Sequence, residues 1–128
     1  MTDMISLKDV LLARQRIAPH LARTPLLSHP VLAREAGCDL WLKHENHNPT
    51  GAFKIRGGLN LMAALSSEER RRGVITATRG NHGLSIAFAA RLHNVHATII
   101  VPHGNNPEKN EAIRAIGAEL IEHGRDFD

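Results

Sequence analysis

The N-terminal part of the chain carries apolar side chains at helical spacing. Ser6 and Asp9 form a capping-box-like pair that predicts the start of a first helix, and Pro19 limits its end. The apolar positions of this helix are Leu7, Val10, Leu11 and Ile17. The pattern then predicts three short elements, which are an extended segment over 24–27, a helix over 31–36 closed by Gly37, and a strand over 39–43.

From Phe53 onward, helical and strand patterns alternate regularly. Helices are predicted over 53–65, 68–72, 81–92 and 107–116, and strands over 74–78, 97–101 and 119–121. Ser67 and Asn106 are the predicted N-caps of the second and fourth of these helices, and Gly117 ends the fourth. The predicted apolar stripe of the third helix consists of Leu84, Ala87, Phe88 and Leu92.

Strands that alternate with helices through short connections predict a parallel sheet with right-handed crossovers. Continuously apolar strands, as over 97–101, are typical of a sheet that is covered on both faces. We therefore expect an α/β fold with an open parallel sheet and flanking helices.

Composition narrows the class of protein. The 128 residues are 42% hydrophobic, and no apolar run approaches the roughly 18 residues that span a bilayer. Aromatic residues make up 3% with no tyrosine, which leaves little material for stacking on nucleic-acid bases, and the net charge of +3 is only weakly basic. The single Cys38 suits a reducing compartment. We expect a soluble cytoplasmic protein that binds neither nucleic acid nor membrane.

Lys54 is the first candidate for chemistry. Pro49 and Gly51 predict a turn, and the apolar stretch after Phe53 predicts a helix, which places Lys54 in its first turn. A cation there faces the positive end of the helix dipole, which is unfavourable for its charge. A neutral lysine amine is a nucleophile suited to Schiff-base chemistry. The alternative is a lysine whose side chain simply reaches solvent at a helix start.

A second candidate is the loop over 78–83, which leads from a predicted strand into a helix. Ligands of open α/β sheets bind beyond the carboxyl ends of the strands, where such loops lie. Gly80 lets the backbone approach a ligand, Thr78, Asn81 and His82 add side-chain donors, and Arg79 suits a carboxylate. The spacing is neither a dinucleotide fingerprint nor a Walker A loop.

Together the two segments resemble one family. Residues 43–57 look like the K-x-E-x-x-x-P-T-G-S/A-F-K-x-R-G signature of fold-type II pyridoxal-phosphate (PLP) enzymes, and residues 78–83 look like their S-x-G-N-H-G/A loop. The serine/threonine dehydratase and serine racemase branch is the most similar. Thr24-Pro25-Leu26 and residues 109–119 also match stretches of the family.

The resemblance implies a role for each matching residue. Lys54 bonds the cofactor covalently and is the base that removes the substrate's α-proton. Phe53 lies against the cofactor ring, and Asn81 hydrogen-bonds the ring's 3′-oxygen. The substrate's carboxylate binds at the loop formed by Thr78, Arg79, Gly80, Asn81 and His82. The implied activity is removal of water from threonine, serine or 3-hydroxyaspartate, followed by hydrolysis of the product to a 2-oxo acid and ammonia.

Arg79 departs from the family pattern, because racemases carry a serine acid/base at that position. A guanidinium that stays charged is a poor proton shuttle. We therefore expect no racemisation, and Arg79 instead favours a substrate with an additional carboxylate or tightens carboxylate binding.

The resemblance also implies an architecture of two domains. It makes the chain the N-terminal portion of a longer enzyme, with residues 1–52 a segment that packs on a large domain and residues 53–128 an incomplete small α/β domain. The family's glycine-rich phosphate-binding loop is then expected downstream, so the chain by itself is expected to be inactive and marginally folded. The full-length enzyme is expected to be a homo-oligomer, a dimer.

Other functions stay open on the sequence alone. A PLP-dependent β-replacing synthase or a threonine synthase shares the lysine helix, and a non-catalytic fragment or binding module is the alternative outside the enzymes. The pairs His44 and His47, and His93 and His96, lack the spacing of a metal site, so no metal is predicted.

Overall fold

The computed structural model describes residues 4–126. Its elements, in chain order, are α1 (Leu7–Ile17), β1 (Leu26–Ser28), α2 (Pro30–Ala36), β2 (Trp41–Lys43), the 3-10 helix η1 (Glu45–His47), α3 (Ile55–Ala64), α4 (Ser67–Arg72), β3 (Val74–Ala77), α5 (Asn81–Leu92), β4 (Ala97–Val101), α6 (Pro107–Ile116) and β5 (Glu119–Glu122). No helix among these residues is long and apolar enough to cross a membrane.

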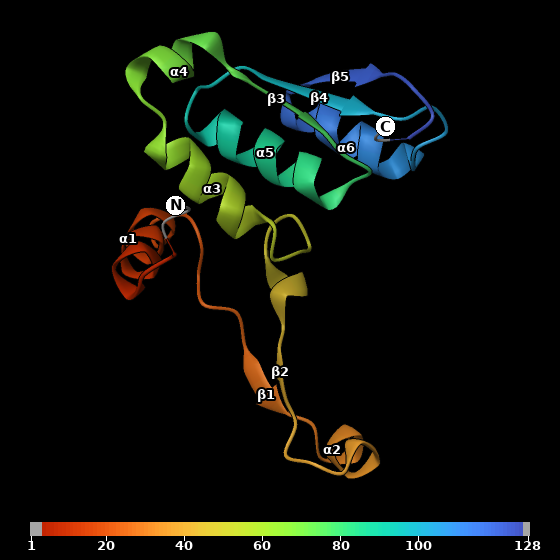
Figure 1. Ribbon diagram of the computed structural model, residues 1–128. Coiled ribbons are helices and arrows are strands. Elements are labelled where there is room, and N and C mark those ends of the chain that lie inside the picture. Colours follow the sequence, from red (N-terminus) through yellow and green to blue (C-terminus); the bar gives the residue numbers. More distant parts are fainter. Residues whose placement is uncertain (1–3, 127–128) are drawn as a thin grey trace.

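The predicted parallel sheet is confirmed. Strands β3, β4 and β5 lie side by side in that order, all parallel, with β4 in the middle. Helices α5 and α6 connect them and pack against the sheet, α3 packs on α5, and α1 packs on α3 (Figure 1). The result is a stack of layers in which α5 lies between the sheet and α3.

Within residues 4–126, helices cover only one face of this sheet, and the other face is open. Ile75 and Ile121 lie on the open face, where they are 68% and 41% exposed, whereas Ile99 on the other face is fully buried. The physical reason is chirality. Successive right-handed crossovers in the strand order β3-β4-β5 place both connecting helices on the same side.

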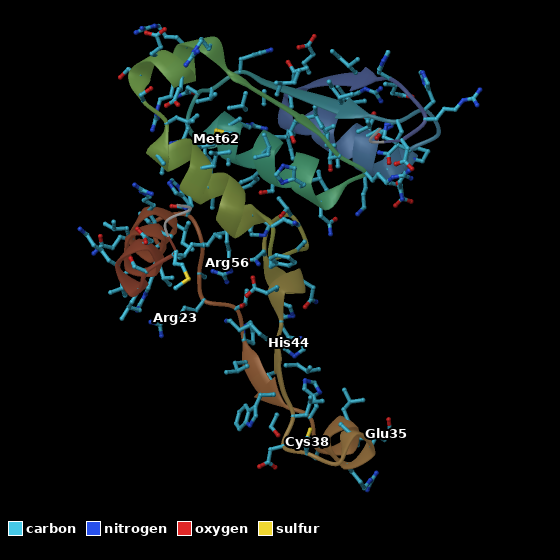
Figure 2. All side chains as sticks on the ribbon, in the orientation of Figure 1. Arg23, Glu35, Cys38, His44, Arg56 and Met62 are labelled. Carbon is cyan, nitrogen blue, oxygen red and sulfur yellow. The ribbon has the colours of Figure 1, made fainter. Side chains whose placement is uncertain are left out.

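The core lies between α3, α5, α6 and the covered face of the sheet. Its largest fully buried hydrophobic side chains are Ile55, Leu59, Met62, Ile99, Val101 and Ile113. Figure 2 shows Met62 at the interface of α3 and α5. The buried face of α5 is broader than the predicted stripe: Ile86 and Ala89 are buried, whereas Leu92 is 44% exposed.

Residues 18–52 form an arm that extends away from the sheet (Figure 1). Strands β1 and β2 pair antiparallel within it, from Leu26 opposite Lys43 to Ser28 opposite Trp41, and α2 lies at its tip. Large apolar side chains on the arm are exposed, among them Leu26, Leu27, Val31, Leu32 and Trp41. The predicted packing of residues 1–52 on a further domain stays a prediction.

Side-chain N-caps account for the starts of α1, α4 and α6. The capping box of Ser6 and Asp9 is present, and Asn106 caps α6 through the amide of Lys109. The N-cap of α4 is Ser66 and not Ser67 as predicted, because Ser66 lies three residues before Glu69 and the two exchange reciprocal hydrogen bonds.

Candidate functional site

Lys54 lies at the N-terminal end of α3. The helix begins at Ile55, so Lys54 is its N-cap residue and not a residue of its first turn as predicted. The Lys54 carbonyl accepts hydrogen bonds from the amides of Gly57 and Gly58, at 3.1 and 3.3 Å. Its Nζ lies 5.5 Å from the centre of the Phe53 ring, and both side chains are exposed. The backbone at Lys54 is therefore fixed while its amine is accessible.

A buried serine on α5 ties Lys54 to the second motif. The Ser85 hydroxyl donates to the Lys54 carbonyl at 2.6 Å, and Ser85 is fully buried. Gly58 makes this close packing of α3 on α5 possible, because a β-carbon there would lie 2.7 Å from the Ser85 carbonyl oxygen and would also overlap the Ser85 hydroxyl. Since α5 begins in the second motif, this contact sets the spacing between the two motifs.

The loop over 78–83 forms a compact turn at the carboxyl end of β3. Oγ1 of the buried Thr78 accepts hydrogen bonds from the amides of Gly80, at 3.0 Å, and Gly83, at 3.2 Å. Gly83 must lack a side chain, since a β-carbon there would lie 2.5 Å from Thr78 Cγ2 and 2.8 Å from Ile99 Cγ2. Thr78 thus builds the turn, and its hydroxyl is turned inward.

The two motifs meet at one cavity of about 420 Å³. Lys54 and Phe53 line it from the first motif, and His82 lines it from the second. The rest of its lining consists of Arg56, Gly57, Gly58, Leu61 and Ile86. A mainly apolar hollow with a few convergent polar groups is the usual form of a small-molecule site. An amine and an imidazole in such a cavity can bind a carbonyl compound and move protons.

Two of the predicted site residues turn toward other partners. Asn81 Oδ1 accepts a hydrogen bond from Lys109 Nζ at 2.7 Å, and Arg79 Nη2 lies 2.6 Å from Asp126 Oδ1. Neither Asn81 nor Arg79 lines the cavity that holds Lys54. Gly80 lies against the Lys109 side chain.

A charged cluster supports the lysine segment from the side of the arm. Both oxygens of the Glu45 carboxylate bind Arg56, at 2.7 and 2.9 Å, and also accept from Thr24 at 2.6 Å and Asn48 at 2.8 Å. The hydrogen bonds from the Arg56 guanidinium, with those from Thr24 and Asn48, lower the pKa of Glu45 to about 2 despite its partial burial. Figure 2 shows Arg56 where α3 meets the arm. This cluster fixes Arg56, and through it one wall of the cavity.

Sequence reasoning missed three residues that act on the site, namely Glu45, Ser85 and Lys109. Glu45 stands in the signature itself, where its spacing from Arg56 is the available signal. Ser85 is a polar residue within the apolar run of α5, which marks it as a side chain with a specific buried partner. Only the folded chain brings Lys109 to Asn81.

Comparisons with known proteins agree on one family. The sequence model of the family described as pyridoxal-phosphate dependent enzyme matches residues 17–128. The chain is 41% identical over 125 residues to a Thermotoga maritima protein named L-threonine ammonia-lyase, covering 98% of this chain and 31% of that protein. It is 40% identical over 117 residues to the L-threo-3-hydroxyaspartate ammonia-lyase of Saccharomyces cerevisiae, covering 91% of this chain and 36% of that protein.

Solved structures give the same picture. Maize serine racemase superposes with a TM-score of 0.89 at 34% identity, over 95% of this chain and 37% of that one. The threonine deaminase of T.th. superposes with a TM-score of 0.83 at 37% identity, over 96% of this chain and 38% of that one. The chain thus spans about a third of the length of the curated relatives it matches.

Proposed function

Because the chain belongs to the pyridoxal-phosphate dependent enzymes, we propose that the complete protein is a PLP-dependent ammonia-lyase of fold type II. Its substrate is a hydroxy amino acid, namely threonine, serine or 3-hydroxyaspartate, which loses ammonia and is left as a 2-oxo acid. Two relatives are named for activity on threonine and on 3-hydroxyaspartate, which supports this substrate class.

The residues at the cavity fit the cofactor. Covalent binding of the PLP aldehyde requires a primary amine, and Lys54 provides one that is exposed beside the cavity. A flat pyridine ring requires apolar and aromatic surfaces, which Phe53, Leu61 and Ile86 supply. Gly57 also leaves room, since a β-carbon at that position would meet no atom within 4 Å.

We assign the cofactor contacts as follows. Lys54 would hold the aldehyde carbon and Phe53 would lie against the ring. Asn81, which does not line the cavity itself, would donate to the 3′-oxygen from the neighbouring loop. The bound cofactor supplies an electron sink that acidifies the α-carbon of the amino acid. The protein's part is to hold the amine, the ring contact and the amide donor in fixed positions.

Lys54 also serves as the proposed base, with its Nζ accepting the proton from the substrate's α-carbon. This role requires that the amine stay close to the reacting carbon, and the hydrogen bond from Ser85 to the Lys54 carbonyl holds the main chain there. His82, which lines the same cavity, is a donor for the substrate's carboxylate or its departing hydroxyl.

Arg79 is proposed to set substrate preference. Its guanidinium binds the carboxylate of Asp126. The carboxylate of a substrate can take the place of Asp126, because it offers the same pair of acceptor oxygens. Thr78 and Gly80 shape the loop that presents Arg79, Asn81 and His82. A substrate with a second carboxylate, such as 3-hydroxyaspartate, gains most from Arg79.

The single observation that carries this proposal is that Lys54 and His82, from two separate motifs, line one cavity. The test is to incubate the complete polypeptide with PLP and each of the three hydroxy amino acids and to measure 2-oxo acid. We expect product from the wild type and from Lys8→Ala, a control lysine on α1, and none from Lys54→Ala. A protein that forms the cofactor adduct but yields no 2-oxo acid from any of them is a β-replacing synthase or a binding module.

The homo-oligomer and the cytoplasmic location stay predictions. The exposed apolar side chains of the arm are compatible with a partner surface, and sedimentation of the complete polypeptide measures its oligomeric state.

A further inference from the structure

Lys109 is a lysine of α6 whose side chain reaches the second motif. Its Nζ donates to Asn81 Oδ1 at 2.7 Å, across 28 residues of sequence. The side chain gets there by lying over Gly80, where a β-carbon would be 2.5 Å from Lys109 Cδ and 2.9 Å from Nζ. Any residue other than glycine at position 80 would close this path.

The main chain at Lys109 is fixed. Its amide donates to the side chain of the N-cap residue Asn106 at 3.2 Å. The next residue, Asn110, is buried and accepts a hydrogen bond from Asn105 at 2.6 Å. Lys109 therefore projects from a defined position in the first turn of α6.

The stability of α6 does not explain a lysine at this place. Cations in the first turn of a helix oppose the helix dipole, and acidic residues such as Glu108 are favoured there. Replacing the ammonium should leave α6 as stable or slightly more stable. The contact with Asn81 is thus the feature that accounts for the charge.

The chemistry of the contact is directional. An ammonium has only donors, so it can bind the oxygen of the Asn81 amide and not its nitrogen. When Asn81 Oδ1 is bound by Lys109, the two N–H groups of Asn81 Nδ2 point away from Lys109 and can donate to another acceptor. Without Lys109, the Asn81 amide can rotate about its Cβ–Cγ bond and present its oxygen in place of its N–H groups.

We propose that Lys109 is a positioning residue that fixes the orientation of the Asn81 amide, so that Asn81 presents N–H donors to the 3′-oxygen of the cofactor. This inference rests on the proposed function. It assigns to Gly80 the further task of leaving room for the Lys109 side chain.

The test compares Lys109→Met, Lys109→Arg and Asn81→Asp in the complete polypeptide. Methionine keeps the stem over Gly80 without the charge, arginine keeps a side chain that only donates, and aspartate has no N–H to offer. Arg114→Met on the same helix is the matched control for loss of one cation. The readouts are the dissociation constant of PLP and the absorption maximum of the bound cofactor.

Loss of one oriented hydrogen bond should weaken PLP binding about tenfold in Lys109→Met and Asn81→Asp, with a shifted absorption maximum in both. Lys109→Arg should restore the wild-type spectrum, and Arg114→Met should match the wild type in both readouts. Wild-type affinity and spectrum in Lys109→Met, or in Asn81→Asp, would overturn the inference. If the wild type forms no cofactor absorption band, both the proposed function and this inference fail. If the wild type forms a normal band and Lys109→Met is unaffected, only the role of Lys109 is refuted.

Discussion

Two adjacent glycines on α3 should respond in opposite ways to the same substitution. A β-carbon at Gly58 would overlap the Ser85 hydroxyl and lie 2.7 Å from the Ser85 carbonyl oxygen and 3.0 Å from its carbonyl carbon. A β-carbon at Gly57 would meet no atom within 4 Å. Gly58→Ala therefore tests the contact between the two motifs, and Gly57→Ala is its matched control.

The magnitudes follow from two opposing effects. Alanine in place of glycine within a helix stabilises by roughly 0.5–1 kcal/mol, and Gly57→Ala should show this gain. Overpacking a filled interface costs about 1–3 kcal/mol. At Gly58 the upper part of that range applies, because the Ser85 carbonyl belongs to the backbone of α5 and cannot rotate away. We expect Gly58→Ala to be less stable than Gly57→Ala by about 2–3 kcal/mol.

The assay is urea unfolding of the complete polypeptide, followed by circular dichroism, for the wild type and both variants. Adding Ser85→Ala to Gly58→Ala should recover only part of the loss, since it removes the hydroxyl and leaves the carbonyl in place. Equal stability of Gly57→Ala and Gly58→Ala would refute the close packing of α3 on α5, and with it the fixed spacing of the two motifs.

Two further predictions concern charged groups. The pKa of Glu45 is lowered from 4.5 to about 2, so its contribution to stability is present above its unfolded pKa and is lost as the pH falls from about 4.5 through about 2. Glu45→Gln should lower the free energy of unfolding by roughly 2 kcal/mol near neutral pH. Urea unfolding measured at several pH values should then show a smaller loss of stability between about pH 4.5 and pH 2 than in the wild type. An equal loss in the variant and the wild type would show that the carboxylate is not ion-paired. Arg79→Ser should raise KM for 3-hydroxyaspartate by about tenfold with a smaller change for threonine in steady-state kinetics, and an unaltered order of preference would remove Arg79 from substrate selection.

Helix boundaries were predictable because their causes are local. Asn106 and Pro107 start α6 and Gly117 ends it, as the sequence indicates, and α5 runs over 81–92 as predicted. The error at α4 was also local. Serine caps helices well at either position, and only the spacing to Glu69 selects Ser66.

Features that depend on tertiary packing were not predictable in the same way. Leu92 belongs to the predicted apolar stripe of α5 but is 44% exposed. The open face of the sheet within residues 4–126 follows from the crossover order and not from strand composition. The roles of Lys54 and Asn81 came from motifs, but the partners that hold these residues, Ser85 and Lys109, lie 31 and 28 residues away and meet them only in the fold.

The central claim is that the amine of Lys54 bonds the cofactor's aldehyde. The most direct measurement is to add PLP to the complete polypeptide, reduce with borohydride, digest, and locate the pyridoxyl group by mass spectrometry. We predict one labelled peptide, modified at Lys54, and no label in Lys54→Ala. A label on Lys43 or Lys109 in place of Lys54, or no label at all, would contradict the assignment.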